Sequence, residues 1–160
     1  MKYNLSESIE VIRDKKRAFW AKMVKEEGVQ AFQGFVELLA LLKSQGFKIA
    51  IASNRNEAFV HLILDSLKVK EFFHTIVGSI EGRRQKPFPD IYIHAAKELG
   101  MDPIDCVVLE DAEIGIKSAK DAGMKAIAIP NVYTQGHDFS KADKIVKSLS
   151  DVNIEFLESL

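Results

Sequence analysis

Two adjacent carboxylates, Glu110 and Asp111, stand where they could bind a metal ion. They directly follow Cys106–Leu109, an apolar run of the length expected for a buried strand of a parallel sheet. Apolar residues then recur at helical spacing until Gly123, a typical end of a helix. This arrangement places the two acids at the carboxyl edge of the sheet, where open α/β sheets bind their ligands. Oxygen donors of this kind suit Mg2+.

Two further polar residues occupy comparable positions. Ser53 follows an apolar run and precedes a helical pattern, so its hydroxyl and nearby free backbone N–H groups could hold a phosphate. Lys86 precedes two prolines that fix the backbone, so its ammonium could stabilise charge that develops on a phosphate oxygen. Each also has a simpler interpretation, Ser53 as a helix N-cap and Lys86 as a solvated loop lysine. Asp111 could likewise be an N-cap beside a surface acid at Glu110.

All of these residues fall at strand-to-helix turns on the same edge of the predicted sheet. A hydroxyl, a cation and a pair of carboxylates that meet there would form a site for a phosphate and a metal ion. The simpler interpretations would require three independent coincidences. The sequence therefore predicts one site built from Ser53, Lys86, Glu110 and Asp111.

The elements that must position this site alternate between short apolar strands and helices. Such alternation predicts an α/β fold with right-handed βαβ units, that is, a Rossmann-like parallel sheet with helices on both faces. A long N-terminal helix is expected from an N-cap at about Ser6 to Glu27, followed by a linker over Gly28–Gly34. Strands are expected over 47–52, 73–78, 106–109, 125–130 and 144–146, with a turn over 53–56, and further helices over 35–44, 57–67, 91–99, 114–122 and 153–160.

The composition narrows the class of protein. The 160 residues are 47% hydrophobic and 28% charged, as expected for one ordinary globular domain. A net charge of -1 gives no indication of a nucleic-acid groove or an anionic membrane surface, and no apolar run has the length of a membrane span. The single cysteine, Cys106, excludes a disulfide framework and indicates a cytoplasmic location. The four histidines lack the spacing of zinc ligands.

Three stretches of the chain resemble motifs of a known family. IAIASNR around Ser53, KPFPD at Lys86 and VVLEDAEIGIKSAKDAG at Glu110 and Asp111 are similar to motifs two, three and four of the haloacid dehalogenase superfamily. The similarity is greatest to the β-phosphoglucomutase-like phosphatases and phosphohexomutases. It extends over about residues 28–146, with the motifs in the family's order.

The resemblance implies a role for each residue of the predicted site. Ser53 would bind the transferring phosphoryl group, and Asn54 would line the phosphate pocket beside it. Lys86 would stabilise the charge of the phosphoryl group, which makes it a catalytic residue together with Ser53. Glu110 and Asp111 would help to hold Mg2+, the cofactor of the family.

One motif of the family is missing from this chain. The family's nucleophile is an aspartate in a D-x-D at the end of the first strand, but the sequence contains no D-x-D, and nothing before Phe35 has a strand pattern. The chain therefore resembles an N-terminally truncated member. Residues 1–30 would be a remnant of the helical cap and its hinge, and residues 31–160 the α/β core without its first strand. Without the nucleophile, the covalent aspartyl-phosphate route is closed.

The missing strand would also leave a gap in the sheet. In the family fold it lies between the strands that end at Ser53 and Glu110, so two apolar edges would be exposed. We expect the gap to be closed in one of three ways. The two strands pair directly with each other, a second chain supplies a strand, or an upstream segment does so.

These observations favour a Mg2+-dependent hydrolase or mutase that acts on small phosphate monoesters such as sugar phosphates, with a nucleophile that this chain does not contain. The alternative is a catalytically inactive fragment that keeps the scaffold as a binding or interaction module. The expected partners are a small phosphorylated metabolite and, for the sheet, a second chain or an upstream segment. Neither nucleic acid nor a membrane is expected as a partner.

Overall fold

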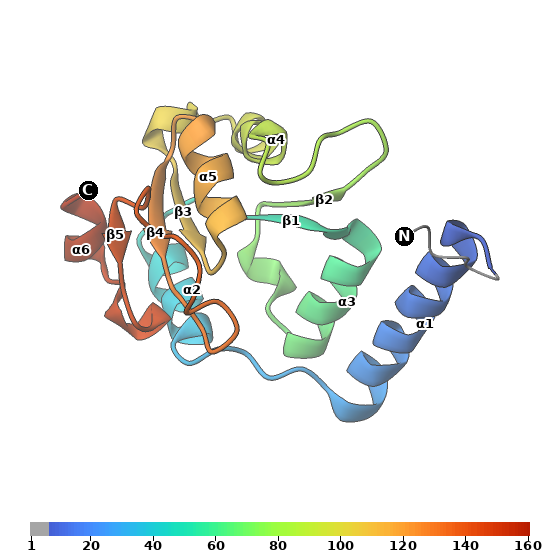
Figure 1. Cartoon of the computed structure of the whole chain (residues 1–160). Helices are drawn as coiled ribbons and strands as arrows, with labels where there is room; N and C mark the ends of the chain where they lie inside the picture. Colours follow the sequence, from blue (N-terminus) through green and yellow to red (C-terminus); the bar gives the residue numbers. More distant parts are fainter. Residues whose placement is uncertain (1–6) are drawn as a thin grey trace.

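The computed structural model describes residues 7–160, which form an α/β fold of short parallel strands and helices (Figure 1). The predicted fold class is therefore confirmed. The helices are α1 (Ile9–Glu27), α2 (Phe35–Ser44), α3 (Glu57–Leu67), α4 (Asp90–Leu99), α5 (Glu113–Asp121) and α6 (Ile154–Glu158). The strands are β1 (Ala50–Asn56), β2 (Thr75–Ser79), β3 (Val107–Glu110), β4 (Lys125–Ala128) and β5 (Lys144–Ile145), with short 3-10 turns over Lys70–Phe72, Pro103–Asp105 and Leu149–Asp151.

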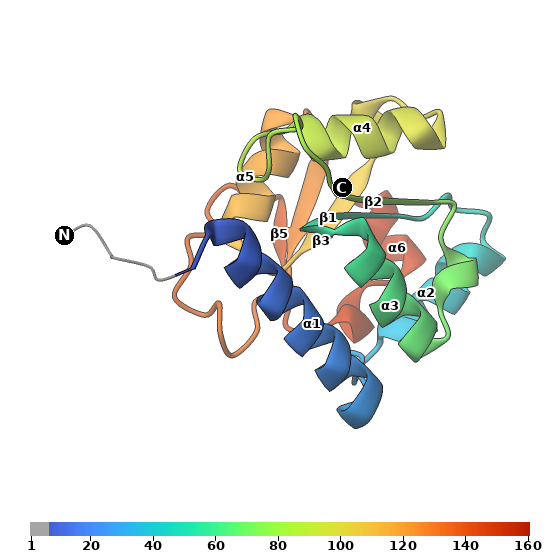
Figure 2. The same cartoon turned by 90° about the vertical axis from the view of Figure 1, so that its right-hand side faces the viewer.

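The N-terminal helix α1 stands at one side of the molecule and reaches the rest through the extended linker after Glu27 (Figure 1). Its N-cap is Ser8, whose hydroxyl accepts a hydrogen bond from the Val11 N–H at 3.3 Å. The expected cap at Ser6 lies outside the described residues. Helix α1 lies beside α3 and contacts it (Figure 2). It leaves large apolar side chains in solvent, and Phe19 is 56% exposed. The division of the chain into a cap remnant and a core stays a prediction.

The strands form two separate parallel sheets. One contains β1 and β2, with Ala52 opposite Val77, and the other has the order β3-β4-β5, with Glu110 opposite Ala128. Within residues 7–160 no ladder joins β1 to β3, so direct pairing of the strands at Ser53 and Glu110, the first of the three expected ways to close the gap, is wrong. The other two ways stay predictions. Each sheet is fixed instead by its own helices, because α3 packs on β1 and β2 whereas α5 packs on β3 and β4.

Helices cover both faces of the β1-β2 sheet because its apolar residues alternate. Ala50 and Ala52 face a cluster formed with α4, whereas Ile49 and Ile51 face a second cluster formed with α2 and α3. Side chains of a strand point alternately to its two faces, so a continuous apolar run serves two cores at once. This explains why residues 49–52 are all apolar.

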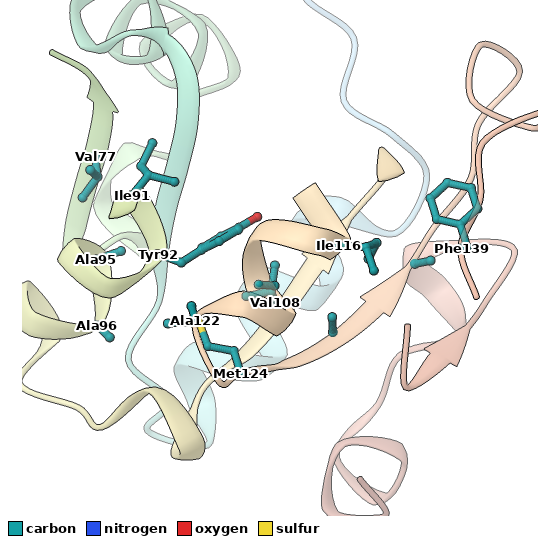
Figure 3. Packing of buried hydrophobic residues seen from close by; sticks show 13 residues of the cluster. Val77, Ile91, Tyr92, Ala95, Ala96, Val108, Ile116, Ala122, Met124 and Phe139 are labelled. Atoms are coloured by element: carbon teal, nitrogen blue, oxygen red, sulfur yellow. The ribbon is translucent and has the colours of Figure 1, made fainter. Parts of the chain in front are cut away.

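Helix α4 connects the two sheets. Its buried residues Ile91, Tyr92, Ala95 and Ala96 belong to one cluster with Val77 of β2 and with buried residues of β3, α5 and β4 (Figure 3). Most of the facing side chains on α5 and β4 are small, which allows close approach of these elements. The core therefore continues from one sheet to the other through α4, although the strands themselves do not pair.

The predicted element boundaries are correct for α2 and α3 and shifted elsewhere. The structure places β1 at Ala50–Asn56, so the residues expected as a turn, 53–56, belong to the strand. The register of β1 against β2 is irregular between Ala52 and Asn56, which is where the polar residues begin. Sequence patterning marked this change of polarity but could not distinguish an irregular strand end from a turn. Among the described residues, no helix is long and apolar enough to cross a membrane.

Candidate active site

Lys86 and Glu110 form an ion pair at the carboxyl edge of the strands. The Nζ atom of Lys86 donates to Oε1 of Glu110, and the two side chains are only 9% and 10% exposed. Lys86 lies in the loop between β2 and α4, whereas Glu110 is the last residue of β3, so residues 24 positions apart meet across the two sheets. A buried charge needs a partner of opposite sign, and each of these residues supplies it for the other.

Tyr92 is the third member of this cluster, and the sequence analysis missed it. Its hydroxyl accepts a hydrogen bond from Lys86 Nζ at 2.8 Å and donates to Oε1 of Glu110. The ammonium also lies 4.5 Å from the centre of the tyrosine ring. Burial, followed by the negative charge of Glu110, raises the pKa of Tyr92 well above its usual value, so the phenol stays protonated. An aromatic residue on a helix is usually part of a core, so no pattern in the sequence marked this hydroxyl as part of a site.

Asn54 holds the backbone of Lys86 in place. Its amide group donates to the Lys86 carbonyl at 3.2 Å and accepts from the Lys86 N–H at 2.9 Å. These two bonds join the end of β1 to the loop before α4. Asn54, which was predicted to line the phosphate pocket, thus lies beside Lys86, which was predicted to bind the phosphate.

Ser53 precedes Asn54 in the irregular end of β1. Its hydroxyl accepts a hydrogen bond from the Arg55 N–H at 3.1 Å. The N-cap of α3 is Asn56, so the simpler interpretation of Ser53 as a helix cap is wrong. The described contacts connect Ser53 to the cluster only through its neighbour Asn54 and the backbone.

Asp111 is held by a residue that the sequence analysis also missed. The side-chain amide of Asn131, in the loop after β4, donates to Oδ2 of Asp111 at 2.7 Å. The N-cap of α5 is Ala112, so Asp111 does not cap this helix. An amide that fixes one carboxylate oxygen orients the other. Asn131 follows the carboxyl end of a strand, as does Asp111, and this position was the available signal.

The loop that carries Lys86 is fastened at two further points. Arg84 forms two hydrogen bonds with Asp90 at 2.9 and 2.8 Å, and its guanidinium holds the pKa of that carboxyl below its usual value. The buried hydroxyl of Ser118 in α5 donates to the Phe88 carbonyl at 2.7 Å. These bonds tie the loop to the first turn of α4 and to α5.

The acids suit part of a magnesium site. Glu110 and Asp111 offer only oxygen atoms, and one oxygen of each is already fixed by a neighbouring donor. Within residues 7–160 there is no group of three His, Cys, Asp or Glu side chains that could hold a metal. Because Mg2+ is commonly bound by one or two carboxylates with water and phosphate oxygens, the pair fits this cation.

A surface hollow lies away from these residues. It has a volume of about 620 Å³ and lies around the beginning of β2, at the amino end of the strand, rather than at the carboxyl edge that carries Lys86. The polar contacts at the carboxyl edge bring together buried groups of opposite charge, whereas the hollow is open to solvent. Its lining residues are His61, Lys70, Glu71, Phe73, His74, Thr75 and Ile76.

The chain has relatives in a known family of enzymes. Residues 2–129 match the haloacid dehalogenase-like hydrolases, and the chain belongs to this family. It is 35% identical to a β-phosphoglucomutase from Bacillus subtilis over 98% of the chain and 66% of that protein. It is 39% identical to a bifunctional riboflavin kinase/FMN phosphatase from Arabidopsis thaliana over 86% of the chain and 36% of that protein.

A solved structure shows the same fold. The crystal structure of CbbY from Rhodobacter sphaeroides in complex with phosphate superposes with a TM-score of 0.91 at 28% identity. The match covers 99% of this chain and 72% of that one. The chain thus spans about two thirds or less of the two curated relatives, at 66% and 36% of their lengths.

Proposed function

We propose that this chain is part of a Mg2+-dependent phosphoryl-transfer hydrolase, a phosphatase or phosphomutase, whose substrates are small phosphate monoesters such as sugar phosphates. The observation that carries the proposal is the buried cluster in which the Lys86 ammonium contacts Glu110 while Asn54 clamps the Lys86 backbone. Its location at the carboxyl ends of parallel strands is the usual ligand edge of such sheets. Phosphate bound in the related CbbY structure supports this class of ligand.

Lys86, Ser53 and Asn54 would have different roles in binding the phosphoryl group and stabilising its charge. The Lys86 ammonium would bind a phosphoryl oxygen and stabilise the charge that moves onto it during transfer. The Ser53 hydroxyl and the Asn54 side chain would bind the remaining oxygens and fix the orientation of the group. Binding by several fixed donors lowers the barrier because the site does not have to reorganise during the reaction.

Glu110 and Asp111 would supply oxygen ligands for Mg2+. When bound, this ion would act as a Lewis acid that neutralises negative charge on the phosphoryl oxygens. Asn131 would keep one oxygen of Asp111 hydrogen-bonded, so that the other oxygen is held in one orientation. The two carboxylates alone do not complete the coordination of Mg2+. Further oxygen donors would have to come from water, the substrate or another segment.

The nucleophile would come from outside this sequence. We infer that a strand with a carboxylate at its end pairs with the free edges of β1 and β3, supplied by an upstream segment or by a second chain. The support is that both strands are sheet edges in the described part of the chain and that α4 packs a continuous core beneath both. Unpaired edges readily accept another strand. We place the assembled protein in the cytoplasm because the chain has one cysteine.

A second function is favoured by a different observation. The sequence has no D-x-D, and the described residues contain no group of three potential metal ligands. A chain of this kind could retain the scaffold as a catalytically inactive binding or interaction module. Phosphate binding without turnover under every condition below would favour this alternative.

The test measures phosphate binding and turnover separately. Titration calorimetry with inorganic phosphate in the presence of Mg2+ should detect binding to the chain, and Lys86→Met should weaken it at least tenfold. Lys117→Met is the matched control, because Lys117 forms an exposed pair with Asp121 on α5. Hydrolysis of an aryl phosphate should appear when an N-terminal extension with a strand ending in D-x-D is fused to the chain. Absence of phosphate binding, or equal binding by Lys86→Met, would contradict the proposal.

A further inference from the structure

We propose that Tyr92 is a positioning residue, whose hydroxyl locks Lys86 and Glu110 together and leaves one N–H of the ammonium directed to the phosphate. This inference rests on the proposed function for the identity of the ligand. The lock itself depends only on the contacts among the three side chains.

The donor count of the lysine supports this role. A lysine ammonium has three N–H donors, and two of them bond to the Tyr92 hydroxyl and to Oε1 of Glu110. Among residues 7–160 no third hydrogen-bond acceptor is found for this ammonium, so one donor remains for a ligand. With Glu110 alone, the ammonium could rotate about a single bond, whereas two acceptors fix the direction of the third N–H.

The hydroxyl cannot be explained by core packing. The ring of Tyr92 lies in the buried cluster between α4 and the α5–β3 side of the molecule, and a phenylalanine would fill the same volume (Figure 3). The only polar atom of the side chain lies at the end of this ring and bonds to both charged groups. A buried hydroxyl is costly without partners, and here both partners belong to the proposed site.

Gly115 also contributes to the enclosure of Glu110. A Cβ atom at this position would collide with the carboxylate of Glu110, so the absence of a side chain makes room for it. Glu110 is therefore closely surrounded by Gly115, Tyr92 and Lys86, and its side chain is only 10% exposed. An enclosed carboxylate holds the ammonium more rigidly than a solvated one would.

The experiment uses nuclear magnetic resonance of lysine ammonium groups in the intact chain. A shielded and hydrogen-bonded ammonium should give a sharp 1H–15N signal, assigned to Lys86 by its loss in Lys86→Met. Tyr92→Phe removes only the hydroxyl, and we expect at least tenfold faster exchange of the ammonium protons with water, which broadens the signal. Tyr133→Phe is the matched control, because Tyr133 is 89% exposed. Backbone spectra of each variant report whether the fold is retained.

A second variant keeps the proposal testable if Tyr92→Phe does not fold. Tyr92→3-fluorotyrosine, made by codon reassignment, keeps a hydroxyl that can accept from Lys86 and donate to Glu110, and should retain the sharp signal. An unchanged Lys86 signal in Tyr92→Phe, or a signal lost equally in the 3-fluorotyrosine variant, would overturn the positioning role. Addition of inorganic phosphate should shift the wild-type signal. If it does not, while Tyr92→Phe still broadens the signal, the proposed function fails and the lock stands.

Discussion

Replacement of Gly115 by alanine is a sharp test of how firmly the Glu110 carboxylate is held. Gly115 is buried in the first turn of α5. Its backbone has an ordinary helical conformation, so alanine introduces no backbone strain there. The added Cβ would occupy the space of the Glu110 carboxylate. The carboxylate would therefore have to leave Lys86 and Tyr92, or the helix would have to shift.

Two opposing effects set the size of the change. Alanine favours a helix over glycine by at most about 1 kcal/mol. Separation of a buried ion pair costs about 3–5 kcal/mol, since it leaves charges without compensation. The second effect is larger, and we expect Gly115→Ala to lower the free energy of unfolding by about 2–4 kcal/mol. In a chain of this length that corresponds to a decrease of roughly 5–15 °C in Tm.

The assay is urea unfolding followed by circular dichroism, with a double-mutant cycle to identify the cause. In a Glu110→Ala background the collision is absent, so Gly115→Ala should there be neutral or stabilising by up to about 1 kcal/mol. Gly136→Ala is the matched control, because a Cβ at Gly136 would meet no atom within 4 Å. Equal effects of Gly115→Ala in both backgrounds, or wild-type stability of the single variant, would refute the assignment of a fixed Glu110.

Three further predictions concern the contacts around the site and the end of the sheet. Ser118→Ala removes the hydrogen bond from the buried Ser118 hydroxyl to the Phe88 carbonyl and should lower the free energy of unfolding by about 1–2 kcal/mol in urea melts, and no change would show that the bond contributes nothing. Burial favours the protonated form of Asp143, but hydrogen bonds from Lys120 and a backbone N–H outweigh it and lower its pKa. Stability from this group is present above the usual aspartate pKa and lost as pH falls, so thermal melts between about pH 5 and pH 2 should show a shallower decline for Asp143→Asn than for wild type. The pKa of Tyr92 is raised, so the stability that this group contributes has the opposite pH dependence and is lost as pH rises above about 10. Thermal melts at alkaline pH should therefore show a shallower decline for Tyr92→Phe than for wild type.

The convergence of Lys86 with Glu110 was predictable although 24 positions separate them. Each follows a strand pattern, and the carboxyl ends of parallel strands lie at one edge of a sheet whatever the details of packing. The contributions of Tyr92 and Asn131 were not predictable in the same way. Whether a helical aromatic places its hydroxyl in a core or in a site depends on the distance between α4 and β3. That distance is set by side chains from five elements, namely α4, α5, β2, β3 and β4.

The alternation of strands and helices, the family, and the positions of the polar residues near strand ends could all be predicted from the residues alone. These follow from local periodicity and composition, which act over a few residues. The separation of β1 and β3 into two sheets, and the phenol that completes the lysine–glutamate pair, became visible only in the folded chain. Such choices depend on which surfaces pack together, because a strand edge or a hydroxyl can accept many partners and long-range contacts select one of them.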